Sequence, residues 1–330
     1  FDKNMVLEFL SYELGQPKVD VIDCIKDGNT YSAALHVNFR FKNKDSIVEE
    51  KVYIGDIPMM TDRGTFIING AERVIISQLH RSPGICYEKT RHSSGRTLYS
   101  YRIIPDRGSW MEVQFDINDY IYIYLDRKRR RRKFLISTFL RAIGYDTNRD
   151  MIEAAYTVKT MTPAQLLKAD EIGHYYTFEP VCAADGTVVV PAFIQLSESD
   201  VKSLSENMIK KADFAYIPDG DAYLIKCMEN DPSTTPDEAL KEIYRKMRPN
   251  DPASVTNSKQ LLKRLFFDNK RYDLGAVGRF KLNERLGLNL PENLRVLDKT
   301  DLMEATKGLM KLRSNTGGHT DDIDHLGSRR

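Results

Sequence analysis

A run of seven consecutive basic residues is the strongest chemical signal in this chain, and it extends from Arg127 to Lys133. Seven adjacent cations repel one another and require either water or an anion around them. Guanidinium groups donate paired hydrogen bonds to phosphate, so this composition favours contact with a nucleic-acid backbone. A solvated turn between a strand and a helix fits the same run, and the pattern alone leaves both interpretations open.

The distribution of charge points to a nucleic-acid partner more clearly than its total does. The formal net charge is only +2. Residues 71–141, however, carry fifteen Lys and Arg against seven Asp and Glu, so the remainder of the chain is acidic on balance. This asymmetry predicts a basic surface confined to one region of the molecule.

No motif in the sequence predicts catalysis. Asp321, Asp322 and Asp324 are the nearest approach to a carboxylate cluster. A two-metal nucleotidyl transferase needs carboxylates that converge on Mg²⁺, and these three lie in one short polar stretch. The sequence also has no phosphate-binding glycine loop and no nucleophile elbow. We therefore expect no catalytic residue, metal or cofactor in this chain.

Cysteine usage and hydropathy indicate the compartment. The four cysteines form no CxxC pair, which argues against a zinc ribbon or a disulfide framework and favours reduced thiols. No apolar run approaches the roughly 18 residues that would span a bilayer. The sequence also contains no signal peptide. We expect a cytoplasmic protein without a membrane partner.

Trp110 is the only tryptophan, and it follows Arg107-Gly108-Ser109. The glycine and serine indicate a loop, where an exposed indole can stack on an unpaired base for about 1–3 kcal/mol. A single tryptophan is also common in a core or at a domain interface. Tyr120, Tyr122 and Tyr124 alternate along one strand face and leave the same choice between base stacking and core packing.

An apolar stretch interrupted by glycines predicts a β-hairpin. Phe66–Ile68 is typical of a short strand, and Asn69-Gly70 predicts a turn because both residues tolerate positive φ. Arg73–Leu79 is rich in β-branched residues and predicts the second strand. We expect one face of that strand, including Ile76, to be packed.

The remaining periodicity predicts an α+β fold of two domains, mostly β at first and mixed afterwards. At 330 residues the chain is long enough for two cores. The expected strands cover Ala33–Phe41, Glu49–Ile54, Tyr120–Leu125 and Thr187–Phe193. The expected helices cover Phe134–Ile143, a short helix after Thr162, Ser197–Ile209, Pro236–Met247, Ser258–Phe267 and Asp298–Leu312.

Several blocks of the sequence, in order, resemble the β subunit of bacterial RNA polymerase, in the part that builds the protrusion and lobe of its cleft. The longest block is Gly64–Gly84, and the series spans nearly the whole chain. The other blocks are Ile57–Thr61, His92–Gly95, Arg102–Pro105, Arg107–Trp110, Tyr244–Pro249, Arg271–Leu274 and Asp321–Gly327.

The resemblance implies a discontinuous protrusion that the chain leaves in order to build the lobe. On that basis residues 1–84 are the first part of an incomplete protrusion, residues 85–318 are the lobe, and residues 319–330 begin the return into the protrusion. Both ends of the sequence look cut, so we expect an internal fragment of a longer protein.

The resemblance also implies contacts with downstream duplex DNA. Arg127, Lys128 and Arg129 match lobe positions that lie near DNA, and so do Arg248 and Arg271. From the residues alone, an isolated arginine beside a loop fits surface solubility better, so the DNA contact of Arg248 and Arg271 depends on the resemblance.

A second DNA site is implied between lobe and protrusion. In this family a pocket accepts non-template bases near the start site, one stacked and the next, a guanine, bound in the pocket. The matching residues here are Trp110, Arg81, Asp324 and Arg329. An aspartate suits the Watson–Crick edge of guanine, which offers two donors, while the arginines would hold the pocket and a neighbouring phosphate.

Two further surfaces follow from the resemblance. Ile47, Val48 and Glu49 match an edge strand that docks a transcription-repair coupling factor or CarD-like regulators; the pattern alone indicates an ordinary edge strand. Ile76 and Gln78 match positions that flank the rifamycin-binding surface. The main drug-binding segment is absent from this sequence, so we expect poor binding of such a drug.

The leading hypothesis is a non-catalytic, DNA-gripping part of RNA polymerase, associated with the nucleoid and with the β′, α, ω and σ subunits. We expect this fragment to be inactive alone, because the family's Mg²⁺ is bound by another subunit. A free-standing module that binds single-stranded nucleic acid is the alternative, supported by the arginine run and the tyrosines. A third possibility is an enzyme in its own right, but the sequence contains no acid–base or metal-binding group of residues that would support it.

Overall fold

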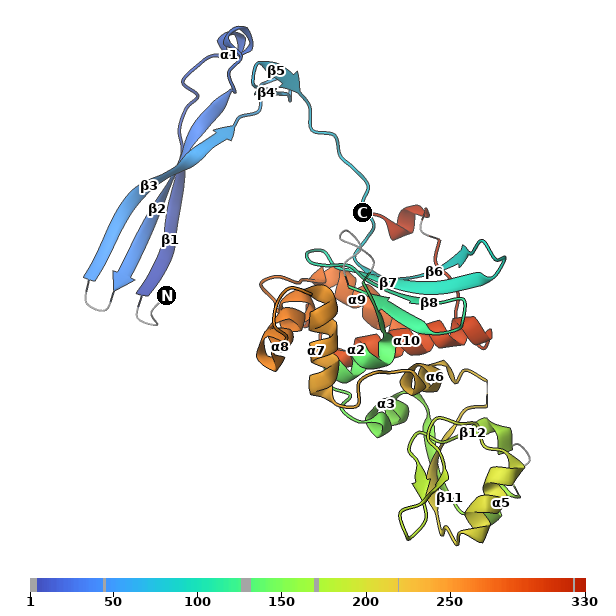
Figure 1. Ribbon diagram of the computed structural model, residues 1–330. Helices are drawn as coiled ribbons and strands as arrows, with labels where there is room; N and C mark the ends of the chain where they lie inside the picture. Colours follow the sequence, from blue (N-terminus) through green and yellow to red (C-terminus); the bar gives the residue numbers. More distant parts are fainter. Residues whose placement is uncertain (1–4, 44–45, 126–131, 169–171, 219, 323) are drawn as a thin grey trace. The chain divides into compact units, whose positions relative to one another are not determined.

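The computed structural model describes residues 5–43, 46–125, 132–168, 172–218, 220–322 and 324–330 (Figure 1). The chain forms two compact units, Phe1–Leu79 and His80–Arg330, which we describe separately. Helices and strands are mixed in both units and the strands form several small sheets, so the predicted α+β class is confirmed. The division into protrusion (1–84), lobe (85–318) and return (319–330) stays a prediction.

The first unit is built on a three-stranded antiparallel sheet in the order β1-β2-β3. The predicted strands Ala33–Phe41 and Glu49–Ile54 are confirmed as parts of β2 and β3. Charged pairs cross one face of the sheet, and Arg40 on β2 contacts Glu8 and Glu49 on its two neighbours. The elements of this unit are β1 (Met5–Leu14), α1 (Val21–Asp27), β2 (Ser32–Asn43), β3 (Ser46–Pro58), β4 (Phe66–Ile68) and β5 (Ala71–Arg73).

The predicted turn of the hairpin is confirmed, but the predicted second strand is not. Asn69 and Gly70 form the turn, at φ 51° and 75°. The second strand ends at Arg73, however, and the prediction of a strand over Arg73–Leu79 is wrong. Its β-branched side chains are exposed instead of packed, and Ile76 is 78% exposed. A strand forms only where a neighbour supplies its hydrogen bonds, and no described residue pairs with residues 74–79.

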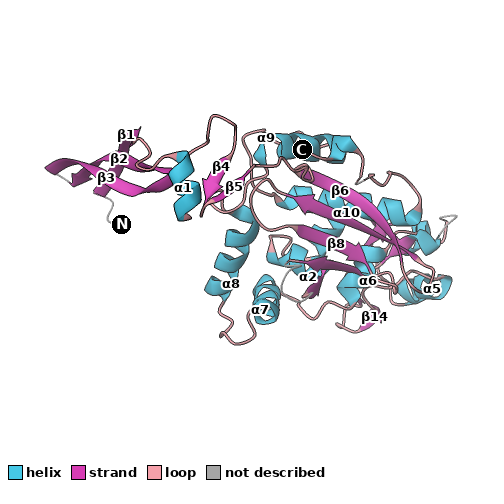
Figure 2. Cartoon of the chain, turned by 90° about the horizontal axis from the view of Figure 1, so that it is seen from above, coloured by secondary structure: helices cyan, strands magenta, loops and turns pink. Residues whose placement is uncertain are grey.

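The second unit centres on a five-stranded antiparallel sheet in the order β10-β9-β8-β7-β6. Its inward side chains, such as Tyr101, Val113 and Ile123, are fully buried. Helices α2, α6 and α10 pack against this inner face (Figure 1, Figure 2). The strands are β6 (Gly84–Arg91), β7 (Thr97–Ile104), β8 (Met111–Phe115), β9 (Ile121–Tyr124) and β10 (Lys133–Leu135).

Side chains cap the N-termini of helices α3, α7, α8 and α10, whereas α2, α6 and α9 have no such cap. Pro236–Met247 is a helix as predicted, whereas Phe134 lies in β10 and the predicted helix begins only at Ile136. The helices are α2 (Ile136–Ala142), α3 (Asn148–Ala155), α6 (Tyr223–Glu229), α7 (Pro236–Met247), α8 (Val255–Leu262), the π-turn η2 (Lys263–Phe267), α9 (Gly275–Leu286), α10 (Lys299–Ser314) and the 3₁₀ turn η3 (Leu326–Ser328).

A smaller sheet with its own core is inserted between α3 and α6. Its order is β11-β15-β12, and Leu166, Val201 and Phe214 are buried in its core. Thr162 and Ser197 cap their helices with capping boxes, as predicted. The elements are β11 (Thr157–Met161), α4 (Pro163–Leu166), η1 (Ile172–His174), β12 (Tyr175–Tyr176), β13 (Val181–Cys182), β14 (Val188–Val190), α5 (Glu198–Glu206) and β15 (Ala212–Tyr216).

A buried ion pair joins helices α9 and α10. Arg279 on α9 donates to both carboxylate oxygens of Asp301 on α10, at 2.8 and 3.0 Å, and both side chains are fully buried. Arg279 also donates to the carbonyls of Leu294 and Val296 in the loop between the helices. Arg279 therefore links α9, α10 and the loop between them by hydrogen bonds. None of the described helices is long and apolar enough to cross a membrane.

Candidate nucleic-acid interface

The last residues of the chain pair with the residues that enter β6. The backbone amide of His80 donates to Arg330 at 2.8 Å, and the amide of Arg330 donates back to His80 at 2.7 Å. Arg81 and Arg329 face each other across this antiparallel bridge. Two of the four residues predicted to form a base pocket are thus neighbours in space although they are distant in sequence.

Asp324 forms an ion pair with one of these arginines, Arg329. The Arg329 guanidinium donates to one carboxylate oxygen of Asp324 at 2.7 Å. The Asp324 side chain is 87% exposed, so its remaining lone pairs face solvent. Each carboxylate oxygen can accept more than one hydrogen bond. The arrangement is an exposed acceptor held by one arginine, and it can accept from a ligand that offers adjacent N–H donors.

Arg81 is held by charges on the outer face of the five-stranded sheet. Its guanidinium lies 3.3 Å from Glu88 on β6, and Glu88 lies 2.9 Å from Arg102 on β7. Arg102 in turn lies 3.4 Å from Glu112 on β8. No pattern in the sequence predicts Glu88, Arg102 and Glu112 as part of the site. Side chains alternate between the two faces along each strand, and this places the three residues on one face of the sheet. The pairing of β6, β7 and β8 then brings them next to one another.

Trp110 lies where the sequence predicted, in a loop directly before β8, and its side chain is 46% exposed. It is therefore not a core tryptophan. Among the described residues, no hydrogen bond or ion pair joins it to Arg81, Asp324 or Arg329. Its membership of the pocket stays a prediction.

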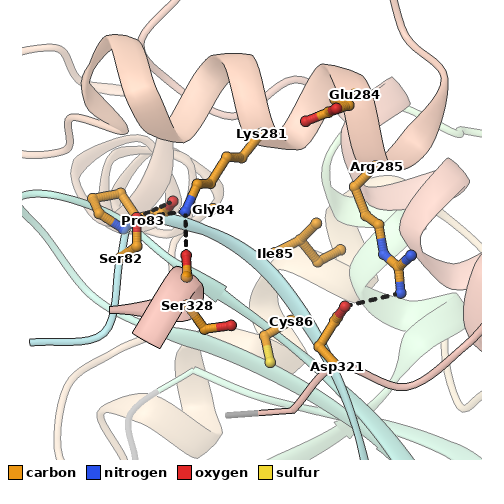
Figure 3. Close-up of a pocket in the computed structure, with 11 residues that line it drawn as sticks. Ser82, Pro83, Gly84, Ile85, Cys86, Lys281, Glu284, Arg285, Asp321 and Ser328 are labelled. Atoms are coloured by element: carbon orange, nitrogen blue, oxygen red, sulfur yellow. Dashed lines mark hydrogen bonds and ion pairs between the residues drawn. The ribbon is translucent and has the colours of Figure 1, made fainter. Parts of the chain in front are cut away.

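A cavity of about 400 Å³ lies beside the bridge, lined by α9, the start of β6, Asp321, Gly327 and Ser328 (Figure 3). Lys281 donates to the Ser82 hydroxyl at 2.9 Å, and Arg285 forms an ion pair with Asp321 at 3.1 Å. Burial raises the pKa of the Cys86 thiol to about 11, and the charge of Asp321 adds to the effect. The thiol is therefore protonated at neutral pH and is a poor nucleophile.

The basic run lies largely outside the described residues, and Arg127, Lys128 and Arg129 belong to that part. Lys133, its last member, begins β10 and lies 4.0 Å from the centre of the Tyr122 ring. Tyr122 belongs to the partly exposed face of β9, while its neighbours on the other face are core residues. Tyr122 and Tyr124 therefore lie outside the core, whereas Tyr120 packs against it.

The two isolated arginines that were predicted to lie in the lobe are both exposed. Arg248 caps the end of α7 and lies 3.4 Å from Asp251. Arg271 lies in the turn before Tyr272, and its side chain has no hydrogen-bond or ion-pair partner among the described residues. Both positions are open to solvent, as contact with DNA requires.

Ile47, Val48 and Glu49 lie on β3, which pairs only with β2 among the described strands. Ile47 is 64% exposed and Val48 is 53% exposed, while Glu49 contacts Arg40 at 2.6 Å. The predicted edge strand is present.

Gln78 and Ile76 lie in the exposed irregular segment that follows β5. Within the described ranges, no group of three or more His, Cys, Asp or Glu is placed to hold a metal.

Comparison with known proteins confirms the predicted resemblance. The family model described as "RNA polymerase Rpb2, domain 2" matches residues 198–330. Over its whole length the chain is 48% identical to the DNA-directed RNA polymerase subunit beta of Methylacidiphilum infernorum, 47% identical to that of Protochlamydia amoebophila and 44% identical to that of Chlamydia muridarum. The chain spans 26–27% of the length of these relatives.

Proposed function

The match over the whole chain supports a segment of a bacterial RNA polymerase β subunit, and from it we propose that this chain is a non-catalytic, DNA-gripping part of a DNA-directed RNA polymerase. Its partners are the β′, α, ω and σ subunits and DNA, in the cytoplasm and at the nucleoid. The nucleotidyl transfer takes place elsewhere in the assembly, where Mg²⁺ is bound by another subunit.

The observation that carries the proposal is the convergence of Arg81, Arg329 and Asp324. The bridge between residues 80–82 and 328–330 brings Arg81 and Arg329 together, and Arg329 holds the Asp324 carboxylate, which is open to solvent. Two guanidinium groups suit a phosphate, and the carboxylate suits a base that offers two donors. We assign this site to a guanine of the non-template strand, with Trp110 stacked on the neighbouring base.

The basic run and the two exposed arginines extend this function to downstream duplex DNA. Replacing Arg129, Arg130, Arg131 and Arg132 by serine in the full-length subunit should flatten the salt dependence of DNA binding by the assembled polymerase. Each lost phosphate contact reduces the slope of log affinity against log salt concentration by about 0.9. Four lost contacts would therefore change the slope by about 3.6.

The measurement is a titration of polymerase with duplex DNA over a range of KCl concentrations. Replacing Lys210 and Lys211 by serine is the control, because it removes two adjacent exposed or half-exposed cations outside the basic run. An unchanged slope in the serine variant of the basic run would make that run a solvated turn and would remove it from the DNA interface.

We also propose that the β3 edge docks a transcription-repair coupling factor or a CarD-like regulator. Changing Ile47 to lysine should weaken that complex about tenfold or more, because a charge replaces an exposed apolar side chain beside the free edge. Val6→Lys is the matched control. Val6 on β1 and Ile47 on β3 both lie opposite Lys42 of the central strand, so the two substitutions add the same charge to opposite edges of one sheet. Equal affinity of wild type and Ile47→Lys in a calorimetric titration would move the docking site elsewhere.

A further inference from the structure

The segment that carries Asp324 is fixed to the rest of its unit at two ends. At its start, the Asp321 amide donates to the Tyr87 carbonyl at 2.8 Å, and the Tyr87 amide donates to the Asp321 carboxylate at 2.8 Å. At its end, the bridge described above joins residues 328–330 to residues 80–82. Asp324 lies between these two attachments, in a stretch with exposed side chains.

Arg285 on α9 secures the first attachment. Its guanidinium lies 3.1 Å from the Asp321 carboxylate and donates to the His319 carbonyl at 2.6 Å. It also lies over the ring of Tyr87, with 5.3 Å between the guanidinium carbon and the ring centre. Both members of this pair are largely shielded, at 21% and 25% exposure. Figure 3 shows the guanidinium directed at Asp321 across the cavity.

Lys281 supports the second attachment from the preceding turn of the same helix. Its ammonium group donates to the Ser82 hydroxyl at 2.9 Å and to the Gly327 carbonyl at 3.4 Å. Two cations about one turn apart on α9 therefore hold both ends of the segment. Among the described residues, Arg329 is the one side chain that contacts the Asp324 carboxylate, and the Asp324 amide donates to the Asp322 carboxylate at 3.0 Å. The position of the exposed Asp324 side chain therefore depends on the segment that carries it, and not on packing around it.

We propose that Arg285 and Asp321 form a positioning pair for base recognition: they set where the Asp324 carboxylate stands, and so they determine the preference for guanine and not the overall affinity for DNA. This inference rests on the proposed pocket. The Arg285 guanidinium is engaged by Asp321, His319 and Tyr87, which leaves it little capacity to contact phosphate.

The test uses polymerase reconstituted with full-length β subunits and two promoters that differ only at the non-template base in question. The quantity measured is the ratio of open-complex lifetimes on the guanine and adenine promoters. Arg285→Met should lower this ratio by about 2- to 10-fold, the equivalent of one misplaced hydrogen bond. The lifetime on the adenine promoter should stay unchanged. Asp321→Asn, which keeps the size of the side chain, should lower the ratio in the same direction.

Arg313→Met is the matched control. Arg313 forms an ion pair of similar exposure with Asp119, at 2.8 Å, and neither residue belongs to the Asp324 segment. A general loss of stability would affect both promoters equally. In an Asp324→Ala background, Arg285→Met should cause no further fall in the ratio, because the group that it positions is already gone.

The outcomes separate this inference from the proposed function. If wild-type polymerase shows no guanine preference, or if Asp324→Ala leaves it intact, the pocket and the positioning pair are both wrong. If Asp324→Ala removes the preference while Arg285→Met and Asp321→Asn leave it intact, the pocket stands and the positioning pair is overturned.

Discussion

Replacing Arg279 by methionine should lower the free energy of unfolding by about 3–5 kcal/mol, because it leaves the Asp301 carboxylate buried without its cation. Both side chains are fully buried, and Arg279 donates to both oxygens of Asp301. The substitution also leaves the carbonyls of Leu294 and Val296 without this donor. The apolar methionine fills part of the space but cannot replace any of these hydrogen bonds.

The measurement is urea unfolding of the 330-residue chain, followed by the fluorescence of Trp110, the only tryptophan. Arg149→Met is the control, because Arg149 forms ion pairs with Glu153 and Asp213 that are open to solvent and should each contribute less than about 1 kcal/mol. Adding Asp301→Asn to Arg279→Met should restore part of the loss, since the uncompensated charge is removed. Equal midpoints for Arg279→Met and Arg149→Met would mean that solvent reaches the buried pair.

Local signals in the sequence were sufficient for several helices. Thr235, Pro236 and Glu238 form a capping box with proline at the start of the helix, and α7 has the predicted bounds. Asp298 likewise caps α10. These interactions lie within a few residues of each other, so a single sequence contains all the information that they need.

Predictions that depend on a distant partner were less secure. The β-branched residues after Arg73 favour a strand, but a strand also needs a neighbour, and nothing local reports its absence. The same limit applies to the candidate site. Arg81 and Arg329 meet through a backbone bridge across most of the chain. Only the family resemblance grouped them with Asp324, and neither Arg285 nor Glu88 had any sequence signal beyond its charge.

Asp324→Ala should remove most of the guanine preference of the assembled polymerase at one non-template position. A carboxylate accepts from guanine N1–H and N2–H₂ together, whereas adenine offers no such pair of donors, so a well-formed contact discriminates by about 1–3 kcal/mol. Arg329 occupies one carboxylate oxygen at 2.7 Å, and the 87% exposure of the side chain leaves acceptor capacity for the base. The ratio of open-complex lifetimes on guanine and adenine promoters should therefore fall by about 5- to 150-fold.

Two comparisons separate base recognition from general electrostatics. Glu292→Ala removes one exposed negative charge from another loop and should leave the lifetime ratio unchanged. Trp110→Ala should shorten lifetimes through weaker stacking at the neighbouring base, with less effect on the guanine preference. A uniform change on both promoters in Asp324→Ala would indicate only that a negative charge near DNA had been removed. A change confined to the guanine promoter indicates a contact with that base, because the accompanying difference between a G·C and an A·T pair is the same for the wild-type and the mutant polymerase.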